Sequence, residues 1–470
     1  MQFQTIIFWV FVFIVFIIYW NIPGKYRWIV LLLSGYLFYA SWDIKYTLIL
    51  AGVTLLTYFF SRILEKKNGR SRKIFLCGYI FAEVSVLFIF KYINFFSEIW
   101  AKLGKLVGID ITEKVMDIIL PIGISFYIFQ TIGYILDIYY RRISSEKHIG
   151  YLATSIAFFP ILLAGPIERI PNLVSELKLK KIFSYEIAYD GFQRILIGLM
   201  KKMIIADGIA MLFVDPVYNN PEMYYGFPMT ITILLYSVEI YCDFAGYSDL
   251  AIGISKLFGI SICENFRQPY FSDSITKFWK RWHISLTSWF RDYIYIPLGG
   301  NRVSTIKNMR NIFGVYILSG LWHGANWTFL IWGGLNGLIQ IIEKILGKKK
   351  NIRVPSAIKY VFTYLIISIT WVFFRADSLD KAILLIHHCM DGVWNIVNYL
   401  SSGVEFICAS RIQIGIIVVY SILLLVIDIC NEKKLKISIP GWSLTLLLAL
   451  GIAYYSKYGI DSRAFIYFAF

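Results

Sequence analysis

Two histidines lie where an ionisable side chain is costly or unusual, and they are the first candidates for chemistry. The chain has five histidines: His148, His283, His323, His387 and His388. His148 follows a basic cluster, and His387 and His388 end an amphipathic stretch, so these three are expected in a loop and at an interface. His323 lies inside the apolar run Ile312–Leu346, where an ionisable group indicates a functional site. The alternative is a neutral histidine hydrogen-bonded between two helices.

One such histidine could support acyl transfer. A neutral imidazole can take the proton of an alcohol that attacks a thioester, and can then pass it to the leaving thiolate. The reaction otherwise needs an oriented donor and acceptor, and dipoles that stabilise the developing oxyanion. Asn326 lies three residues after His323, close to one helical turn, and could orient a substrate or donate to the oxyanion. Packing of this amide against another helix is the competing interpretation.

Carboxylates in another long apolar run offer a metal site as a competitor. Glu239 and Asp243 are four residues apart and share a helical face, so with His283 or His323 they could form a ligand set. Pairing with basic residues such as Lys280 or Arg281, or lining of a hydrated cavity, is the simpler interpretation. The clustered histidines of a membrane di-iron enzyme do not occur in the sequence. We therefore expect no metal.

The stretch of residues 264–302 is aromatic and basic at once. It is too polar to span lipid and too aromatic for an ordinary loop. Ser274 is typical of a helix N-cap, followed by Lys277, Lys280, Arg281 and His283 in an amphipathic pattern. The tryptophans and tyrosines suit either a helix lying in the headgroup region or a re-entrant element packed inside the protein. The pattern alone leaves both interpretations open.

The composition predicts a polytopic helical membrane protein. Of the 470 residues, 58% are hydrophobic, 18% aromatic and only 16% charged, with a mean hydropathy of +0.64. A soluble domain carries about 25% charged residues. Long continuous apolar runs favour helices over a barrel. The net charge of +16 comes from clusters between apolar runs, as the positive-inside rule expects, so we predict no nucleic-acid partner.

The apolar runs give the expected order of membrane segments. A cytoplasmic basic segment at residues 65–73 follows three runs, which would place the N-terminus outside. Two later runs, Met229–Ile260 and Ile312–Leu346, are too long for one simple span and contain carboxylates or glycines. They are expected to form bent or paired helices that line a cavity. Basic clusters follow several runs, including Lys348–Arg353 and Lys433–Lys436.

Several motifs together resemble the membrane-bound O-acyltransferase family, and its alginate O-acetyltransferase branch in particular. The two most specific are FWKRWHISLTSWFRDYIYIPLGGNR at Phe278–Arg302 and SGLWHGANWTFLIWG at Ser319–Gly333. Weaker supporting motifs are PIGISFYIFQ at Pro121–Gln130, AGPIER at Ala164–Arg169, YCDFAGYSDLAIG at Tyr241–Gly253 and WVFFRADSLDKA at Trp371–Ala382. The resemblance extends over about residues 121–382.

The resemblance implies a fold and a set of site residues. We expect an all-α polytopic membrane protein of roughly 10–12 transmembrane helices, with re-entrant or interfacial helices around a central funnel. The residue matching the family's catalytic histidine is His323, and His283 matches a second polar residue of the active region. Basic side chains at Lys280 and Arg281 could attract the phosphates of coenzyme A. Asn326 is assigned with them to donor binding.

The resemblance also implies partners and a location. The expected donor is acetyl-CoA, used as a substrate and not as a bound cofactor, and the acetyl group passes across the cytoplasmic membrane. A separate extracytoplasmic acetyltransferase then places it on an exopolysaccharide or cell-wall glycan. A related branch serves D-alanylation of teichoic acid, with an acyl carrier protein as donor. The surrounding lipid is the remaining partner.

Two other classes of function compete. A transporter or flippase for a lipid-linked glycan would depend on the carboxylates Glu239, Asp243 and Asp249 and be indifferent to His323. A scaffold for polymer export would need neither histidine. We expect a single integral-membrane domain over 1–470, with N-terminal helices in 1–115, a catalytic core in 116–382 and C-terminal helices in 383–470.

Overall fold

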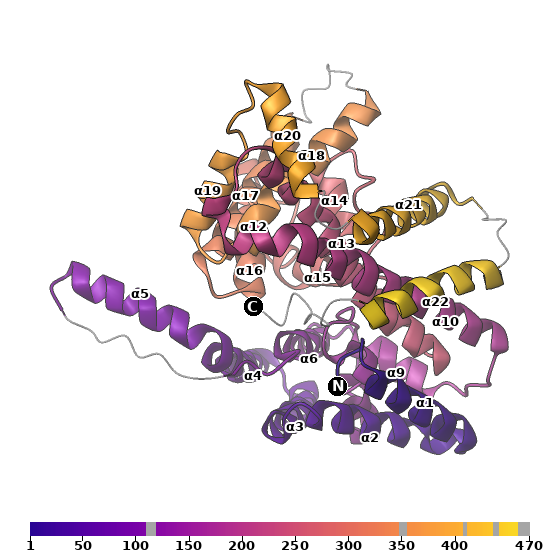
Figure 1. Ribbon diagram of the computed structural model, residues 1–470. Coiled ribbons are helices and arrows are strands. Elements are labelled where there is room, and N and C mark those ends of the chain that lie inside the picture. Colours follow the sequence, from indigo (N-terminus) through magenta and orange to yellow (C-terminus); the bar gives the residue numbers. More distant parts are fainter. Residues whose placement is uncertain (110–118, 347–354, 408–410, 436–440, 459–470) are drawn as a thin grey trace. The chain divides into compact units, whose positions relative to one another are not determined.

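The protein is helical throughout the part that the computed structural model describes, which is residues 1–109, 119–346, 355–407, 411–435 and 441–458 (Figure 1). No strand occurs in those ranges. Six of the helices there are long and apolar enough to cross a membrane, and two shorter helices are also apolar. The all-α polytopic architecture is therefore confirmed. The basic cluster Lys348–Arg353 and the end of Lys433–Lys436 lie outside the described residues.

The chain groups into two compact units. One comprises Met1–Phe192 with Ala251–Cys263, and the other comprises Gln193–Leu250 with Glu264–Phe470. Both candidate histidines belong to the second unit. The expected division between 1–115 and 116–382 falls outside the described residues.

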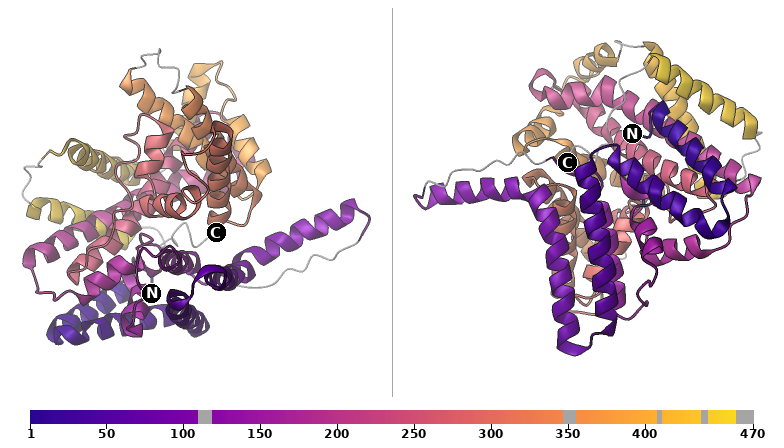
Figure 2. Two further views of the ribbon diagram at one scale, coloured as in Figure 1. Left: turned by 180° about the vertical axis from the view of Figure 1, so that it is seen from behind. Right: turned by 90° about the horizontal axis from the view of Figure 1, so that it is seen from below.

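The first unit consists of helices, and one of them shows how a single residue sets a helix start. α3 (Ile44–Lys66) begins after Asp43, whose carboxylate accepts a hydrogen bond from the backbone amide of Lys45 at 2.7 Å, as an N-cap residue does. α3 and α4 (Gly69–Leu87) lie side by side, and α5 (Ile93–Leu106) extends away from them (Figure 2). The remaining helices are α1 (Ile6–Asn21), α2 (Arg27–Ala40), α6 (Ile124–Tyr139), α7 (Ile149–Ile156), α8 (Phe159–Leu162) and α9 (Ile170–Lys178).

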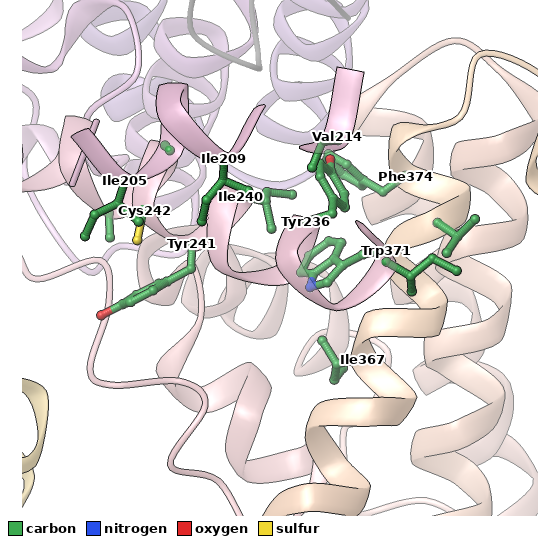
Figure 3. Packing of buried hydrophobic residues seen from close by; sticks show 14 of the residues in the cluster. Ile205, Ile209, Val214, Tyr236, Ile240, Tyr241, Cys242, Ile367, Trp371 and Phe374 are labelled. Carbon is green, nitrogen blue, oxygen red and sulfur yellow. The ribbon is translucent and has the colours of Figure 1, made fainter. Parts of the chain in front are cut away.

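The second unit carries an extensive buried apolar cluster. Trp371 lies at its centre, with Tyr236, Ile367 and Phe374 around it (Figure 3). The helices after α10 (Tyr185–Leu199) are α11 (Asp207–Ile209), α12 (Asp215–Asn219), α13 (Phe227–Leu257), α14 (Ile275–Arg281), α15 (Ile284–Phe290), α16 (Thr305–His323), α17 (Trp327–Leu346), α18 (Ser356–Arg375), α19 (Leu379–His388), α20 (Ile396–Ile407), α21 (Arg411–Lys433) and α22 (Gly441–Tyr458).

One of the two long apolar runs forms paired helices as expected. Ile312–Leu346 divides into α16 and α17, which are joined by a three-residue turn. A Cβ atom at Gly320 would overlap the carbonyl oxygen of Phe329, and one at Gly333 would overlap that of Tyr316. The two backbones therefore pack more closely than larger residues allow. The other run, Met229–Ile260, does not form paired helices: the single helix α13 (Phe227–Leu257) covers most of it and is 31 residues long.

Among the described residues, some of the apolar runs form single long helices, whereas others divide into shorter segments. The run Tyr151–Ile167 forms two short helices, α7 and α8, because Pro160 starts a new turn. The run Ile195–Val214 contains π-helical turns at Met200–Ala206 and Ala210–Val214. Apolar composition predicts burial in lipid or protein, but it does not distinguish a continuous span from a broken one.

Replacement of Gly320 by alanine should destabilise the protein by about 1–3 kcal/mol, because the added methyl group would force α16 and α17 apart. Gly314 is the matched control in the same helix, since a Cβ atom there meets nothing within 4 Å. Thermal unfolding in detergent should show a lower midpoint for Gly320→Ala and no loss for Gly314→Ala. Equal midpoints would contradict the close packing.

Candidate active site

The junction between α14 and α15 places His283. Ser274 caps α14 by accepting a hydrogen bond from the backbone amide of Lys277, which confirms the predicted helix start. α14 ends at Arg281, and His283 then adopts left-handed backbone angles of φ 44° and ψ 54° before α15 begins. A non-glycine residue pays about 1–3 kcal/mol for such a conformation, which persists only where the surroundings enforce it.

Most aromatic side chains of this stretch pack inside the protein, although Tyr295 is only partly buried. Trp279, Trp282, Trp289, Phe290 and Tyr293 are all buried. The stretch is a pair of short helices and not one continuous helix lying on a surface. This burial favours the re-entrant interpretation of residues 264–302 over the interfacial one.

The two candidate histidines lie close together. Their ring centroids are 6.4 Å apart, and their side chains are 2% exposed for His283 and 4% exposed for His323. His283 precedes α15, whereas His323 is the last residue of α16. The fold thus brings two imidazoles, 40 residues apart in sequence, into one buried site.

Aromatic rings surround His323. The ring centroids of Trp332 and Phe374 lie 5.1 and 5.2 Å from that of the imidazole, and the adjacent Trp322 lies at 4.9 Å. Trp332 in turn stacks on Trp371 at 5.6 Å. These rings come from α16, α17 and α18. The close packing of α16 against α17, together with the stacked Trp332 and Trp371, therefore fixes the position of the imidazole. Exclusion of water by such a wall strengthens the polar interactions inside it.

Asn265 is the main polar neighbour of His283. Its side-chain oxygen lies 3.2 Å from Nδ1 of His283 and accepts hydrogen bonds from the hydroxyl and the backbone amide of Ser285, at 2.9 and 3.3 Å. Its side-chain nitrogen donates to the hydroxyl of Ser248 at 3.2 Å. Burial lowers the pKa of His283 to about 3, because the charged imidazolium loses its hydration. The ring is therefore neutral at physiological pH.

The other three predicted site residues are Asn326, Arg281 and Lys280, and each of them has a different environment. Asn326 donates from its side-chain amide to the carbonyl oxygen of Asp377 at 3.0 Å and accepts from the backbone amide of Thr328 at 3.1 Å. These bonds hold the turn between α16 and α17. Arg281 pairs with Glu432 through two hydrogen bonds of 2.9 and 3.0 Å. Lys280 lies exposed at the end of α14.

Two of the three carboxylates of α13, Asp243 and Asp249, form ion pairs. Asp249 accepts from Arg194 at 2.6 Å and from Lys201 at 2.8 Å, and Asp243 lies 2.6 Å from the ammonium of Lys202. Pairing with basic residues was the simpler interpretation of Asp243, although the partner comes from the segment after α10 and not from α14. Buried charges are tolerated when they are paired in this way. Near the pairs, α10 and α13 approach so closely that a Cβ atom at Gly198 or Gly246 would crowd the carbonyl of the other.

A metal site built from the carboxylates of α13 finds no support in the described part of the chain. There, the one group of three side chains whose ligand atoms lie within 4.8 Å of one another is His387, His388 and Asp391. That group contains neither His283 nor His323, and His387 is exposed.

A polar cavity of about 310 Å³ borders the hydrogen-bond network of His283. Asn265 and Ser248 line it, together with the ion-paired Arg194, Lys201 and Asp249. Sequence reasoning expected the run Met229–Ile260, which supplies Ser248 and Asp249, to line a cavity, but it missed Asn265. The signal available was the abrupt change from an apolar run to polar residues at position 264, which marked the stretch without identifying the residue.

Comparison with known proteins identifies the family. The model of the membrane-bound O-acyltransferase family matches residues 140–374, which include both histidines. The chain is also 39% identical to the protein named "Probable alginate O-acetylase AlgI" of Pseudomonas aeruginosa, over 78% of this chain and 70% of that protein. This chain belongs to the membrane-bound O-acyltransferase family. It is an acyltransferase and an integral, multi-pass membrane protein.

Two further relatives of this acyltransferase differ in their named acceptors. The peptidoglycan O-acetyltransferase of Helicobacter pylori is 31% identical over 94% of this chain and 91% of its own length. The teichoic acid D-alanyltransferase of Bacillus subtilis is 28% identical over 70% of this chain and 76% of its own length. The names of the three relatives specify acyl transfer involving alginate, peptidoglycan and teichoic acid.

The depressed pKa of His283 predicts how the stability of this acyltransferase depends on pH. In the unfolded chain the pKa is about 6.5. Between pH 6.5 and about 3 the unfolded state therefore binds a proton that the folded state excludes, so stability falls as pH falls through this window and is complete above it. Unfolding midpoints measured from pH 7 to 4 should fall more steeply for the wild type than for His283→Gln. Parallel curves would contradict a neutral, buried imidazole.

Proposed function

We propose that this enzyme passes an acetyl group from acetyl-CoA across the cytoplasmic membrane for O-acetylation of an exopolysaccharide or cell-wall glycan. His323 is the general base, His283 is the second polar residue of the active site, and residues 116–382 hold the catalytic core. The observation that carries the proposal is the buried pair of imidazoles 6.4 Å apart, one of them enclosed by aromatic rings. The alginate and peptidoglycan relatives support acetyl as the group transferred.

The proposed chemistry uses one imidazole and balances without a cofactor. The acceptor hydroxyl attacks the thioester carbonyl while His323 takes its proton, so that a C–O bond forms and the C–S bond then breaks. The imidazolium returns the proton to the leaving thiolate. Exclusion of water by Trp332 and Phe374 would favour the alcohol over water as the nucleophile.

The polar cavity next to Asn265 is the proposed entrance for the donor. Its volume of about 310 Å³ suits a slender polar arm such as pantetheine, which coenzyme A and acyl carrier proteins share. Lys280 is exposed and available to the phosphates of a donor, and Arg281 would contribute only if its pair with Glu432 opened. Asn326 would act indirectly, by holding the turn that follows His323.

The enzyme would work with a partner on the other face of the membrane. We propose that a separate extracytoplasmic acetyltransferase receives the acetyl group and places it on the polysaccharide. The second candidate function is D-alanyl transfer to teichoic acid from a carrier protein, which the relative from Bacillus subtilis supports. A glycan transporter is the weaker alternative, because two of its three expected carboxylates, Asp243 and Asp249 but not Glu239, are engaged in ion pairs.

Loss of the base should abolish acetylation. In cells that carry His323→Ala at a normal membrane level, base-labile acetate on secreted and surface glycans should fall to that of a gene deletion. The control is His387→Gln, which changes an exposed histidine and should leave acetate unchanged. Wild-type acetate in His323→Ala would remove His323 from the mechanism. Unchanged acetate even in the deletion would overturn O-acetylation of those glycans and favour D-alanyl transfer.

Charge reversal at Lys280 tests its role in donor binding. Lys280→Glu should raise the KM for acetyl-CoA several-fold and leave kcat unchanged, with an effect that shrinks as salt is added. Lys307→Glu, at an exposed position on α16, is the control for a general change in surface charge. Membrane vesicles from cells that also contain the partner acetyltransferase, supplied with labelled acetyl-CoA and polysaccharide, give both constants. An unchanged KM would exclude Lys280 from the donor site.

A further inference from the structure

The hydrogen bonds around Asn265 determine which nitrogen of His283 carries the proton. The backbone amide of Ser285 can only donate, and it points at one atom of the Asn265 side chain at 3.3 Å. That atom must therefore be the oxygen, because an amide nitrogen there would set two donors against each other. The opposite end of the same amide then donates to Ser248, which agrees with this orientation.

The same oxygen lies 3.2 Å from Nδ1 of His283. Two unprotonated acceptors would repel each other at this distance, so Nδ1 must carry the hydrogen. A neutral imidazole has a single N–H, and Nε2 consequently holds a lone pair. A free imidazole side chain in water favours the other tautomer, so the protein selects the less common one.

The backbone reinforces this choice. The amide of Ile284 donates to the carbonyl oxygen of Asn265 at 2.9 Å, and the amide of Arg267 donates to that of Arg281 at 3.0 Å. These two bonds tie the segment before α14 to the α14–α15 junction. Asn265 is fully buried, with 0% of its surface exposed. Its amide is therefore held against a histidine whose own left-handed backbone limits where the ring can turn.

We propose that Asn265 is a positioning residue of the active site, which holds His283 as the Nδ1–H tautomer so that its Nε2 accepts a hydrogen bond from a substrate hydroxyl. The proposal rests on the proposed acyl transfer. It assigns His283 to the alcohol side of the reaction, because a ring with its one N–H engaged by Asn265 cannot also donate to the oxyanion.

The spacing of the two rings agrees with this assignment. With centroids 6.4 Å apart, the nearest ring nitrogens are separated by more than a direct hydrogen bond allows, since each nitrogen lies about 1.2 Å from its ring centre. In the proposed arrangement the reacting hydroxyl of the acceptor lies between the rings and gives its proton to His323. A neighbouring hydroxyl, beside that interval, donates to His283.

The first experiment reads the tautomer directly. Protein labelled with ¹⁵N-histidine is studied by solid-state NMR, and the signals of His283 are identified by their absence in His283→Gln. The wild type should show a protonated Nδ1 and a bare Nε2. Asn265→Asp keeps an acceptor oxygen and should retain that pattern, whereas Asn265→Leu should gain the Nε2–H form. A bare Nδ1 in the wild type, or an unchanged tautomer in Asn265→Leu, would overturn the proposal.

The second experiment connects the tautomer to the reaction. Asn265→Leu should lower kcat on the order of tenfold to a hundredfold, as loss of the partner that orients a histidine does elsewhere. Asn265→Asp should recover most of that loss. Asn336→Leu is the matched control, because Asn336 is equally buried and donates within its own helix to Trp332. A similar loss in Asn336→Leu would show that any buried amide matters alike, and would count against a positioning role.

The two proposals fail in different ways. If the wild type shows the Nδ1–H form and transfers no acetyl group, the proposed function falls and the structural role of Asn265 stands. If acetyl transfer requires His323 but the tautomer does not respond to Asn265, the function stands and the positioning role falls.

Discussion

A backbone that leaves its helix inside a membrane protein must find hydrogen-bond partners, because no water is present to supply them. The segment after α13 meets this requirement by pairing with the α14–α15 junction, through Asn265 with Ile284 and Arg267 with Arg281. The same pairing brings the Asn265 side chain to His283. The same contacts therefore satisfy the irregular backbone and orient the functional imidazole. A regular helix over residues 264–302 would lose these contacts.

The remaining constraint on the site is the close contact of α16 with α17. His323 ends α16, and the glycines at 320 and 333 let the following helix approach without side chains between the backbones. The aromatic rings of Trp332 and Phe374 then reach the imidazole from α17 and α18. A histidine at a helix end would otherwise sample many orientations. Here the packing around it leaves a defined, dry environment, in which a proton transfer is not disturbed by solvent.

The sequence predicted much of this arrangement, and its failures have physical causes. His323 could be recognised because an imidazole is rare in an apolar run, and the paired helices because six glycines interrupt that run. Asn326 was placed near the reaction by its spacing alone, yet its amide is used by the turn. Asn265 lies 18 residues before its histidine, and its role depends on a contact between segments that no periodicity reports. The way that the runs divide into helices was also beyond the pattern, since the proline at position 160 starts a new short helix in a run whose composition stays apolar.

Two adjacent lysines neutralise carboxylates of α13 and also fix the position of that helix. Lys201 reaches Asp249, and Lys202 reaches Asp243, six residues earlier on α13. Six residues correspond to about 9 Å along the axis and about 240° around it, so the two carboxylates face different directions at different heights. Ion pairs at two such points restrain the helix both from sliding along its axis and from rotating about it. α13 is thereby a fixed reference for Ser248, and through Ser248 for the amide of Asn265.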